Sequence, residues 1–235
     1  MPKLIVLALA SLVLALGLAD AASASQAAPL PIGPATTAQA EPEGEAVVLP
    51  SRVAAVIRRT ENSLAKAEEH IDEAEYAKAI ISLRAVRNNL ARADKAARRQ
   101  IDAVPADPEA EVTAGPDSVV AVLTLDQEVI VSLAGLLNGQ SGTLVGALGT
   151  TLTTAQTTRD KLLDVVLALD PEGAGVGYAD VMADTLDGYA DEVANLTEGL
   201  SDDKLSSGGK SILTAGLARS KATLAKIEAA FGGGE

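Results

Sequence analysis

Apolar residues recur at the spacing of one helix face along most of the chain after residue 50. The first two series are Val53, Ile57, Thr60, Leu64, Ala67 and Ile71, then Ala79, Leu83, Val86, Leu90, Ala93 and Ala97. The step from Ile71 to Ala79 breaks the register. We therefore predict a helical hairpin over 51–104 with a tight turn near Asp72–Glu75. One long helix with a skip in its pattern fits the same residues.

Further apolar segments fill the stretch 118–231. The first, Val119–Leu137, is apolar around most of its circumference, with Thr124 and Glu128 as a thin polar wedge. This favours a central helix, although its β-branched residues also allow two strands turning at Asp126-Gln127. The other stripes are Leu148, Leu152, Ala155, Arg159, Leu162, Val166 and Leu169; Met182, Leu186, Tyr189, Val193, Leu196 and Leu200; and Leu213, Leu217, Ser220, Leu224, Ile227 and Phe231. Together they predict an all-α fold, with the hairpin followed by an antiparallel four-helix bundle over 118–231.

Two segments lack this periodicity. Residues 25–50 are rich in Ala, Pro, Thr and Glu, which is typical of a disordered leader. Residues 105–117 are acidic and contain prolines, which favours a linker between the hairpin and the bundle.

The N-terminus has the parts of a secretory signal peptide over 1–24. Lys3 precedes an apolar run from Leu4 to Ala19, and Ala22-Ser23-Ala24 offers a cleavage site. The run is shorter than the ~20 residues of a spanning helix, although an uncleaved anchor remains an alternative. We predict a secreted or cell-envelope protein whose mature chain does not span the membrane.

Charge is unevenly distributed. The chain has a formal net charge of -13 and no cysteine. Residues 51–104 are slightly basic, with eleven Lys and Arg against eight Asp and Glu, whereas 105–203 hold two against eighteen. So acidic a middle argues against nucleic-acid binding. A protein partner at the acidic surface of 180–203 is the hypothesis that this distribution suggests. Without cysteine, the fold depends on packing rather than on disulfides.

Motif searches predict no catalytic, cofactor-binding or metal site. His70 is the only histidine, so a two-histidine zinc site cannot form; we interpret it as a solvated residue near a helix end. Ser63–Lys66, Ser201–Lys204 and Ser207–Lys210 match S-x-x-K without the other elements of penicillin-recognising enzymes. Gly208-Gly209-Lys210-Ser211 lacks the first glycine and the strand of a P-loop, and indicates a loop before the last helix, capped by Ser207 or Ser211.

Two polar runs have ordinary structural interpretations. Asp180, Asp184, Asp187 and Asp191 lie on one helical stripe, which we interpret as a solvated face rather than a Ca²⁺ site. The threonines of 150–158 are expected to bond back to the preceding helical turn. These observations favour a non-enzymatic structural or interaction protein of the cell envelope or extracellular space. The alternative is a helical carrier for a small ligand or cation.

Overall fold

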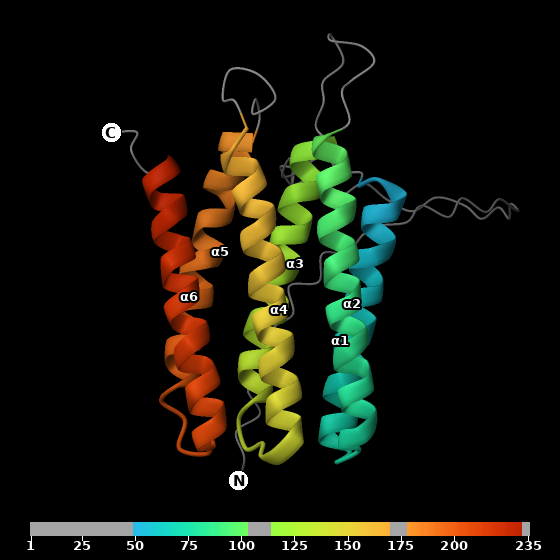
Figure 1. Cartoon of the computed structure of the whole chain (residues 1–235), viewed down its shortest axis with the longest axis vertical. Coiled ribbons are helices and arrows are strands. Elements are labelled where there is room, and N and C mark those ends of the chain that lie inside the picture. Colours follow the sequence, from blue (N-terminus) through green and yellow to red (C-terminus); the bar gives the residue numbers. More distant parts are fainter. Residues whose placement is uncertain (1–48, 103–113, 170–177, 232–235) are drawn as a thin grey trace, which may run out of the picture. The chain divides into compact units, whose positions relative to one another are not determined.

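The computed structural model describes residues 49–102, 114–169 and 178–231. They belong to one compact unit, 48–235, and form six helices (Figure 1). The helices are α1 (Ser51–Asp72), α2 (Tyr76–Ile101), α3 (Ala114–Leu136), α4 (Gly142–Leu167), α5 (Tyr178–Gly199) and α6 (Ser207–Phe231). The all-α prediction is confirmed for this part of the chain, where the one β-like contact is an isolated bridge. The expected signal peptide and nearly all of the leader lie outside the described residues.

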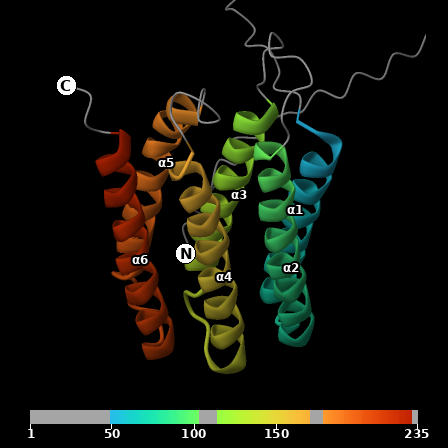
Figure 2. The same ribbon diagram turned by 45° about the horizontal axis from the view of Figure 1, so that its top comes forward.

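The helices pack in two rows of three (Figure 1 and Figure 2). α1, α3 and α5 form one row and α2, α4 and α6 the other, while consecutive helices pair across the rows. The hairpin α1–α2 packs on the other four helices, because α2 contacts both α3 and α4. Ser132 on α3 also donates a hydrogen bond of 2.6 Å to Glu68 on α1. All six helices therefore bury their apolar stripes in a common core.

The apolar segment around Val119–Leu137 is one helix, not a strand pair. α3 begins at Ala114, so residues 114–117, which we assigned to the linker, belong to the helix. Its apolar residues are buried almost all around, and Thr124 and Glu128 form the exposed wedge. Length and apolarity alone would let Gly115–Leu136 span a membrane, and it is the one such helix among the described residues. Its most apolar window is 56% buried against the other helices, and a core helix passes the same test.

A Schellman motif ends α1 at the predicted turn. Glu75 N–H donates to the carbonyl of His70 at 2.7 Å, and Ala74 N–H donates to that of Ile71 at 3.0 Å. Ala74 has the left-handed φ of 58° that this motif requires. The eight-residue step in the apolar pattern is therefore a helix end and not a skip. α2 then starts at Tyr76, with its first apolar residue, Ala79, in the core.

Replacing Ala74 by glycine is expected to raise the free energy of unfolding by about 0.5–1 kcal/mol. Glycine has no Cβ to strain at this φ, and this gain exceeds the extra freedom that it gives the unfolded chain. Urea denaturation followed by circular dichroism would measure the difference. Ala91→Gly, at an exposed position in the middle of α2, is the matched control and is expected to destabilise by a similar amount. Equal effects of both substitutions would contradict the assignment of strain to Ala74.

Candidate functional site

A cluster of buried polar side chains joins α4, α5 and α6. Arg159 is fully buried and donates two hydrogen bonds of 2.5 Å from Nη1 to the carboxylate of Glu192, itself 1% exposed. Ser220 donates to Glu192 as well. Arg159 Nη2 also donates to Asp160 at 3.1 Å and to Thr223 at 3.2 Å. Arg159 lies in the apolar stripe of α4. The sequence pattern does not indicate that its charge is neutralised in the core by Glu192 of α5.

Other polar groups around this ion pair lack partners. Tyr189 lies under the guanidinium, with the ring centroid 5.3 Å from Arg159 Cζ, and its hydroxyl makes no hydrogen bond. Asp126 accepts from Thr158 at 3.3 Å through Oδ1, while Oδ2 has no partner. Burial raises the pKa of Asp126 well above its usual range, although the guanidinium nearby opposes the shift. The packing is tight, since a Cβ on Gly188 would lie 2.6 Å from the Gln127 side chain. We interpret the cluster as a buried polar network that stabilises the packing of α4, α5 and α6 against one another.

The threonine run behaves as expected. Hydroxyls of Thr150, Thr151, Thr154 and Thr157 each donate to the carbonyl four residues earlier, at 2.6–2.8 Å. Thr158 does the same at 3.1 Å. These hydroxyls are therefore satisfied within α4, as their expected structural role requires.

The acidic residues of 180–203 divide into exposed and structural ones. Asp187 and Asp191 are exposed, as a solvated face requires, while the side chains of Asp180 and Asp184 lie outside the described residues. Asp202 has a structural role: it accepts from Asn138 of the α3–α4 turn and from Lys204 N–H at 2.8 Å.

The glycine-rich segment after this acidic loop opens α6. Ser206 Oγ accepts from Gly209 N–H at 3.2 Å, so Ser206 is the capping side chain, and the expected Ser207 already lies inside the helix.

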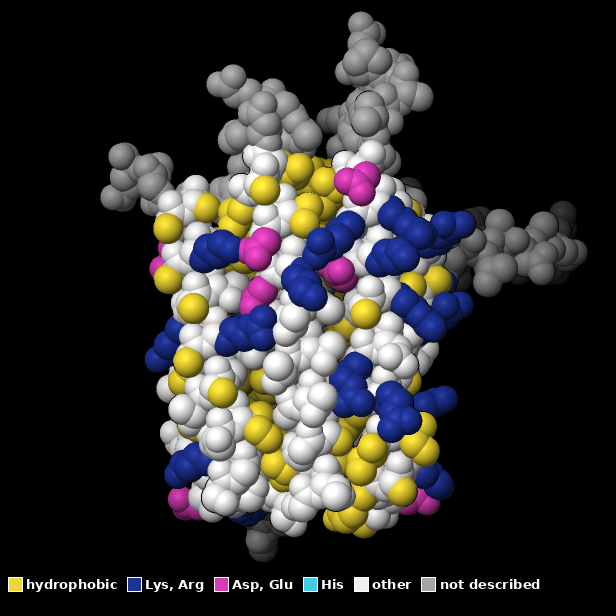
Figure 3. Space-filling view, viewed as in Figure 1, with side chains coloured by type: hydrophobic (Ala, Val, Ile, Leu, Met, Phe, Trp, Pro, Cys, Tyr) yellow, Lys and Arg dark blue, Asp and Glu magenta, His cyan; other side chains and the backbone are white. Residues whose placement is uncertain are grey.

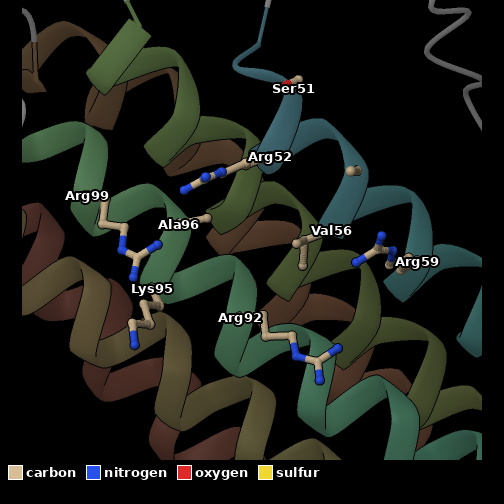
Figure 4. A pocket seen from close by; sticks show the side chains of 9 residues that line it. Ser51, Arg52, Val56, Arg59, Arg92, Lys95, Ala96 and Arg99 are labelled. Carbon is tan, nitrogen blue, oxygen red and sulfur yellow. The ribbon is translucent and has the colours of Figure 1, made fainter.

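A basic groove runs between α1 and α2, and we take it as the candidate ligand-binding site of the described residues. Arg52 and Arg59 project from α1, and Arg92, Lys95 and Arg99 from α2 (Figure 4). The groove has a volume of about 370 Å³. Its remaining lining residues are Ser51, Ala55, Val56 and Ala96. No acidic residue lines it. In the space-filling view, Lys and Arg gather over this side of the molecule (Figure 3).

The two helices present the same pattern to the groove. Each carries arginines seven positions apart, Arg52 and Arg59 on α1 and Arg92 and Arg99 on α2, with small residues between them. Seven helical residues rise by ~10 Å, so the cations at the two ends are about two turns apart. Because the chain reverses at the hairpin, Arg52 lies at the same end as Arg99, and Arg59 at the same end as Arg92 (Figure 4). The sequence shows both seven-residue spacings, but only the pairing of the helices brings the two rows together.

The five groove cations are not neutralised within the described part of the chain. None of them forms an ion pair there. Arg92 makes a 3.5 Å contact with the neutral side chain of Asn89. Among the other cations of α2, Lys78 pairs with Glu75 and Arg98 with Asp94, whereas Arg84 and Arg87, outside the groove, are likewise in no ion pair among the described residues. Five like charges around one hollow repel each other, so an anionic ligand would be stabilised there.

His70 is not simply a solvated residue. Its Nδ1 lies 3.1 Å from a carboxylate oxygen of Glu75 and 4.0 Å from one of Glu73. The structure thus brings together one imidazole and two carboxylates that the sequence analysis did not connect.

Known proteins offer no assignment: the chain matches no family model, no curated protein and no solved structure.

Proposed function

We propose that this chain is an exported, non-enzymatic interaction protein that binds an acidic segment of a protein partner in the α1–α2 groove. The observation that carries the proposal is the set of five unpaired cations around a hollow without acidic lining. Export and a place in the cell envelope or outside the cell rest on the N-terminal pattern over 1–24.

The chemistry of the groove suits carboxylates on a peptide. Four of its five cations are arginines, whose planar guanidinium groups bind carboxylates with two hydrogen bonds at once. The floor between the charged rows consists of Ala55, Val56 and Ala96, which offer apolar contact to small side chains. A peptide in the polyproline II conformation advances ~3.1 Å per residue and presents every third side chain on the same face, so carboxylates three positions apart would match the ~10 Å between the two ends of the groove.

The rest of the chain favours a protein partner over a nucleic acid. Residues 105–203 carry eighteen acidic residues against two basic ones, which repels a long polyanion that extends beyond the groove. Stacking platforms are scarce as well, since the chain has one Phe, three Tyr and no Trp. A short acidic segment fits within the basic area without meeting the acidic surface.

The acidic surface of 180–203 supplies a second candidate contact. Asp187, Asp191, Glu198 and Asp203 are exposed, and none of them is in an ion pair among the described residues. A basic partner would bind there, and the groove of another copy of this chain has the required charge. Sedimentation at low and high salt separates the two cases, because self-association between these surfaces would weaken with added salt.

Peptide titration tests the groove. The probe is an unstructured acidic peptide of about 12 residues with glutamate at every third position, compared with its glutamine counterpart. Arg92→Gln/Arg99→Gln is expected to weaken binding at least about tenfold, because it removes two guanidinium–carboxylate contacts. Fluorescence anisotropy at low and at physiological salt measures the affinity.

Arg84→Gln/Arg87→Gln is the matched control for this experiment. It removes the same charge from the same helix outside the groove, and it is expected to change the affinity less than about threefold. Equal losses in both double variants would mean that the peptide responds to overall charge and that the groove is not the site. Tighter binding to anionic vesicles than to the peptide would identify a membrane surface as the partner instead.

A further inference from the structure

The sole histidine and two glutamates converge where the hairpin turns. We propose that His70, Glu73 and Glu75 bind a divalent transition-metal ion, with Zn²⁺ the best fit. One ligand atom from each of the three residues lies within 4.8 Å of the other two. The site is independent of the basic groove, which lies at the other end of the hairpin.

The distances match a metal polyhedron with little movement. Zn–N and Zn–O bonds of 2.0–2.2 Å in a tetrahedron place neighbouring ligand atoms ~3.4 Å apart. His70 Nδ1 is 3.1 Å from Glu75 Oε2 and 4.0 Å from Glu73 Oε2, on either side of that value. Shifts of about 0.3–0.6 Å would bring these two distances to the tetrahedral value. The ligand atoms of the two glutamates lie within 4.8 Å of each other, and rotation of these side chains would close that pair.

The imidazole nitrogen needs a partner between it and the carboxylates. Nδ1 is shielded from solvent and makes no hydrogen bond, although the carboxylate oxygen of Glu75 is near. An imidazole protonated only on Nε2 would direct the lone pair of Nδ1 at oxygen lone pairs, so either Nδ1 carries a proton and donates it to Glu75 or a cation lies between them. A metal ion satisfies all three residues at once, whereas a proton on Nδ1 is shared between two carboxylates.

The backbone of the turn holds the ligands in place. In the Schellman motif, His70 is the third residue from the helix end and Glu75 the second residue beyond the cap, two positions whose side chains commonly touch through an apolar contact. In this chain, the two side chains that meet at these positions are the imidazole of His70 and the carboxylate of Glu75. Both hydrogen bonds of the motif are present, at 2.7 and 3.0 Å, so the backbone positions of His70 and Glu75 are fixed before any ligand binds.

The ligand set distinguishes among metals. One nitrogen and two carboxylates suit Zn²⁺, Ni²⁺ or Cu²⁺, with water in the open position, and are poor for Ca²⁺ and Mg²⁺, which prefer oxygen ligands alone. Glu75 already binds a cation, since Lys78 Nζ lies 2.7 Å from both of its oxygens. The ammonium group of Lys78 therefore competes with a metal for this carboxylate.

Calorimetric titration of the untagged full chain with ZnCl₂ tests the proposal. We expect one Zn²⁺ per chain, and His70→Ala should lose at least about tenfold in affinity. Glu73→Gln/Glu75→Gln should lose a similar amount, which guards against a folding defect specific to the histidine variant. Because the chain has one histidine, the NMR signal of its imidazole should shift on adding Zn²⁺ and stay unchanged with Mg²⁺.

Two further variants make the test selective. Glu68→Gln/Glu69→Gln, which removes two carboxylates one turn away, should leave the affinity for Zn²⁺ unchanged. Lys78→Met should bind at least about twofold more tightly, because it removes the competing cation.

Unchanged affinity in His70→Ala, equal losses in the control pair, or an equal response to Mg²⁺ would each overturn the site. Unaltered affinity in Lys78→Met would overturn Glu75 as a ligand. Peptide binding in the groove is expected to be the same with and without Zn²⁺, so failure of either proposal can be told from failure of the other.

Discussion

Replacing Arg159 by methionine is expected to lower the free energy of unfolding by about 3–5 kcal/mol. The substitution leaves the carboxylate of Glu192, which is 1% exposed, without its cationic partner in the centre of α4, α5 and α6. The hydroxyl of Ser220 still donates to it, and no other side chain of the described residues is recorded as doing so. A small domain is stable by about 5–15 kcal/mol, so this loss removes a large part of the total. Urea denaturation followed by circular dichroism measures it.

A double variant separates the ion pair from the packing around it. Glu192→Met alone leaves the guanidinium with Asp160 as a carboxylate partner and is expected to cost less than Arg159→Met. Arg159→Met/Glu192→Met is expected to recover most of the loss, because two apolar side chains of similar volume need no partner. Arg219→Met is the matched control: its guanidinium is 35% exposed and pairs with Asp160, so the expected cost is about 1 kcal/mol or less. A loss in Arg159→Met no larger than in this control would show that the buried pair does not hold the helices together.

The helices themselves follow from the sequence, because burial of one face imposes a period that the residues record. The stripe of α2 from Ala79 to Ala97 is buried residue by residue as its spacing predicts. The boundary at Ala114 was missed because proline is tolerated in the first turn of a helix, and Pro116 lies there. The turn at Ala74 carried no glycine to mark it, yet the break in register placed it correctly.

The buried cluster and the two candidate sites could not be derived in the same way. Arg159 falls on an apolar stripe, and nothing local says that Glu192, on another helix and 33 residues away, neutralises it. The groove needs the register between α1 and α2, which sequence periodicity does not supply. His70 and Glu75 are brought together by the Schellman turn, a backbone feature that is normally recognised by a glycine at the position of Ala74. In each case the missing information is which residues of different helices, or of different sides of a turn, face each other.

Replacing Asp126 by asparagine is expected to stabilise the protein at neutral pH by about 1–3 kcal/mol. The carboxyl is 1% exposed, and Oδ2 has no hydrogen-bond partner. Its charged form is therefore poorly accommodated, and burial raises the pKa of this carboxyl well above its usual range. Asparagine has nearly the same shape, can still accept from Thr158, and carries no charge to desolvate.

The raised pKa of Asp126 also determines how the stability of the protein changes with pH. Because the pKa of Asp126 is higher in the folded state, the folded protein binds more protons than the unfolded chain at any pH between the two pKa values. Stability is therefore lost as the pH rises from about 4 through the raised pKa. Asp126→Asn removes this loss, so its advantage over the natural chain should grow with pH from near zero at about pH 3. Asp164→Asn is the control, because its exposed carboxylate pairs with Lys226 at the surface, and it should show no such growth. Urea midpoints from pH 3 to 8 measure both variants, and an advantage of Asp126→Asn that is independent of pH would mean that packing, rather than ionisation of the buried carboxyl, causes it.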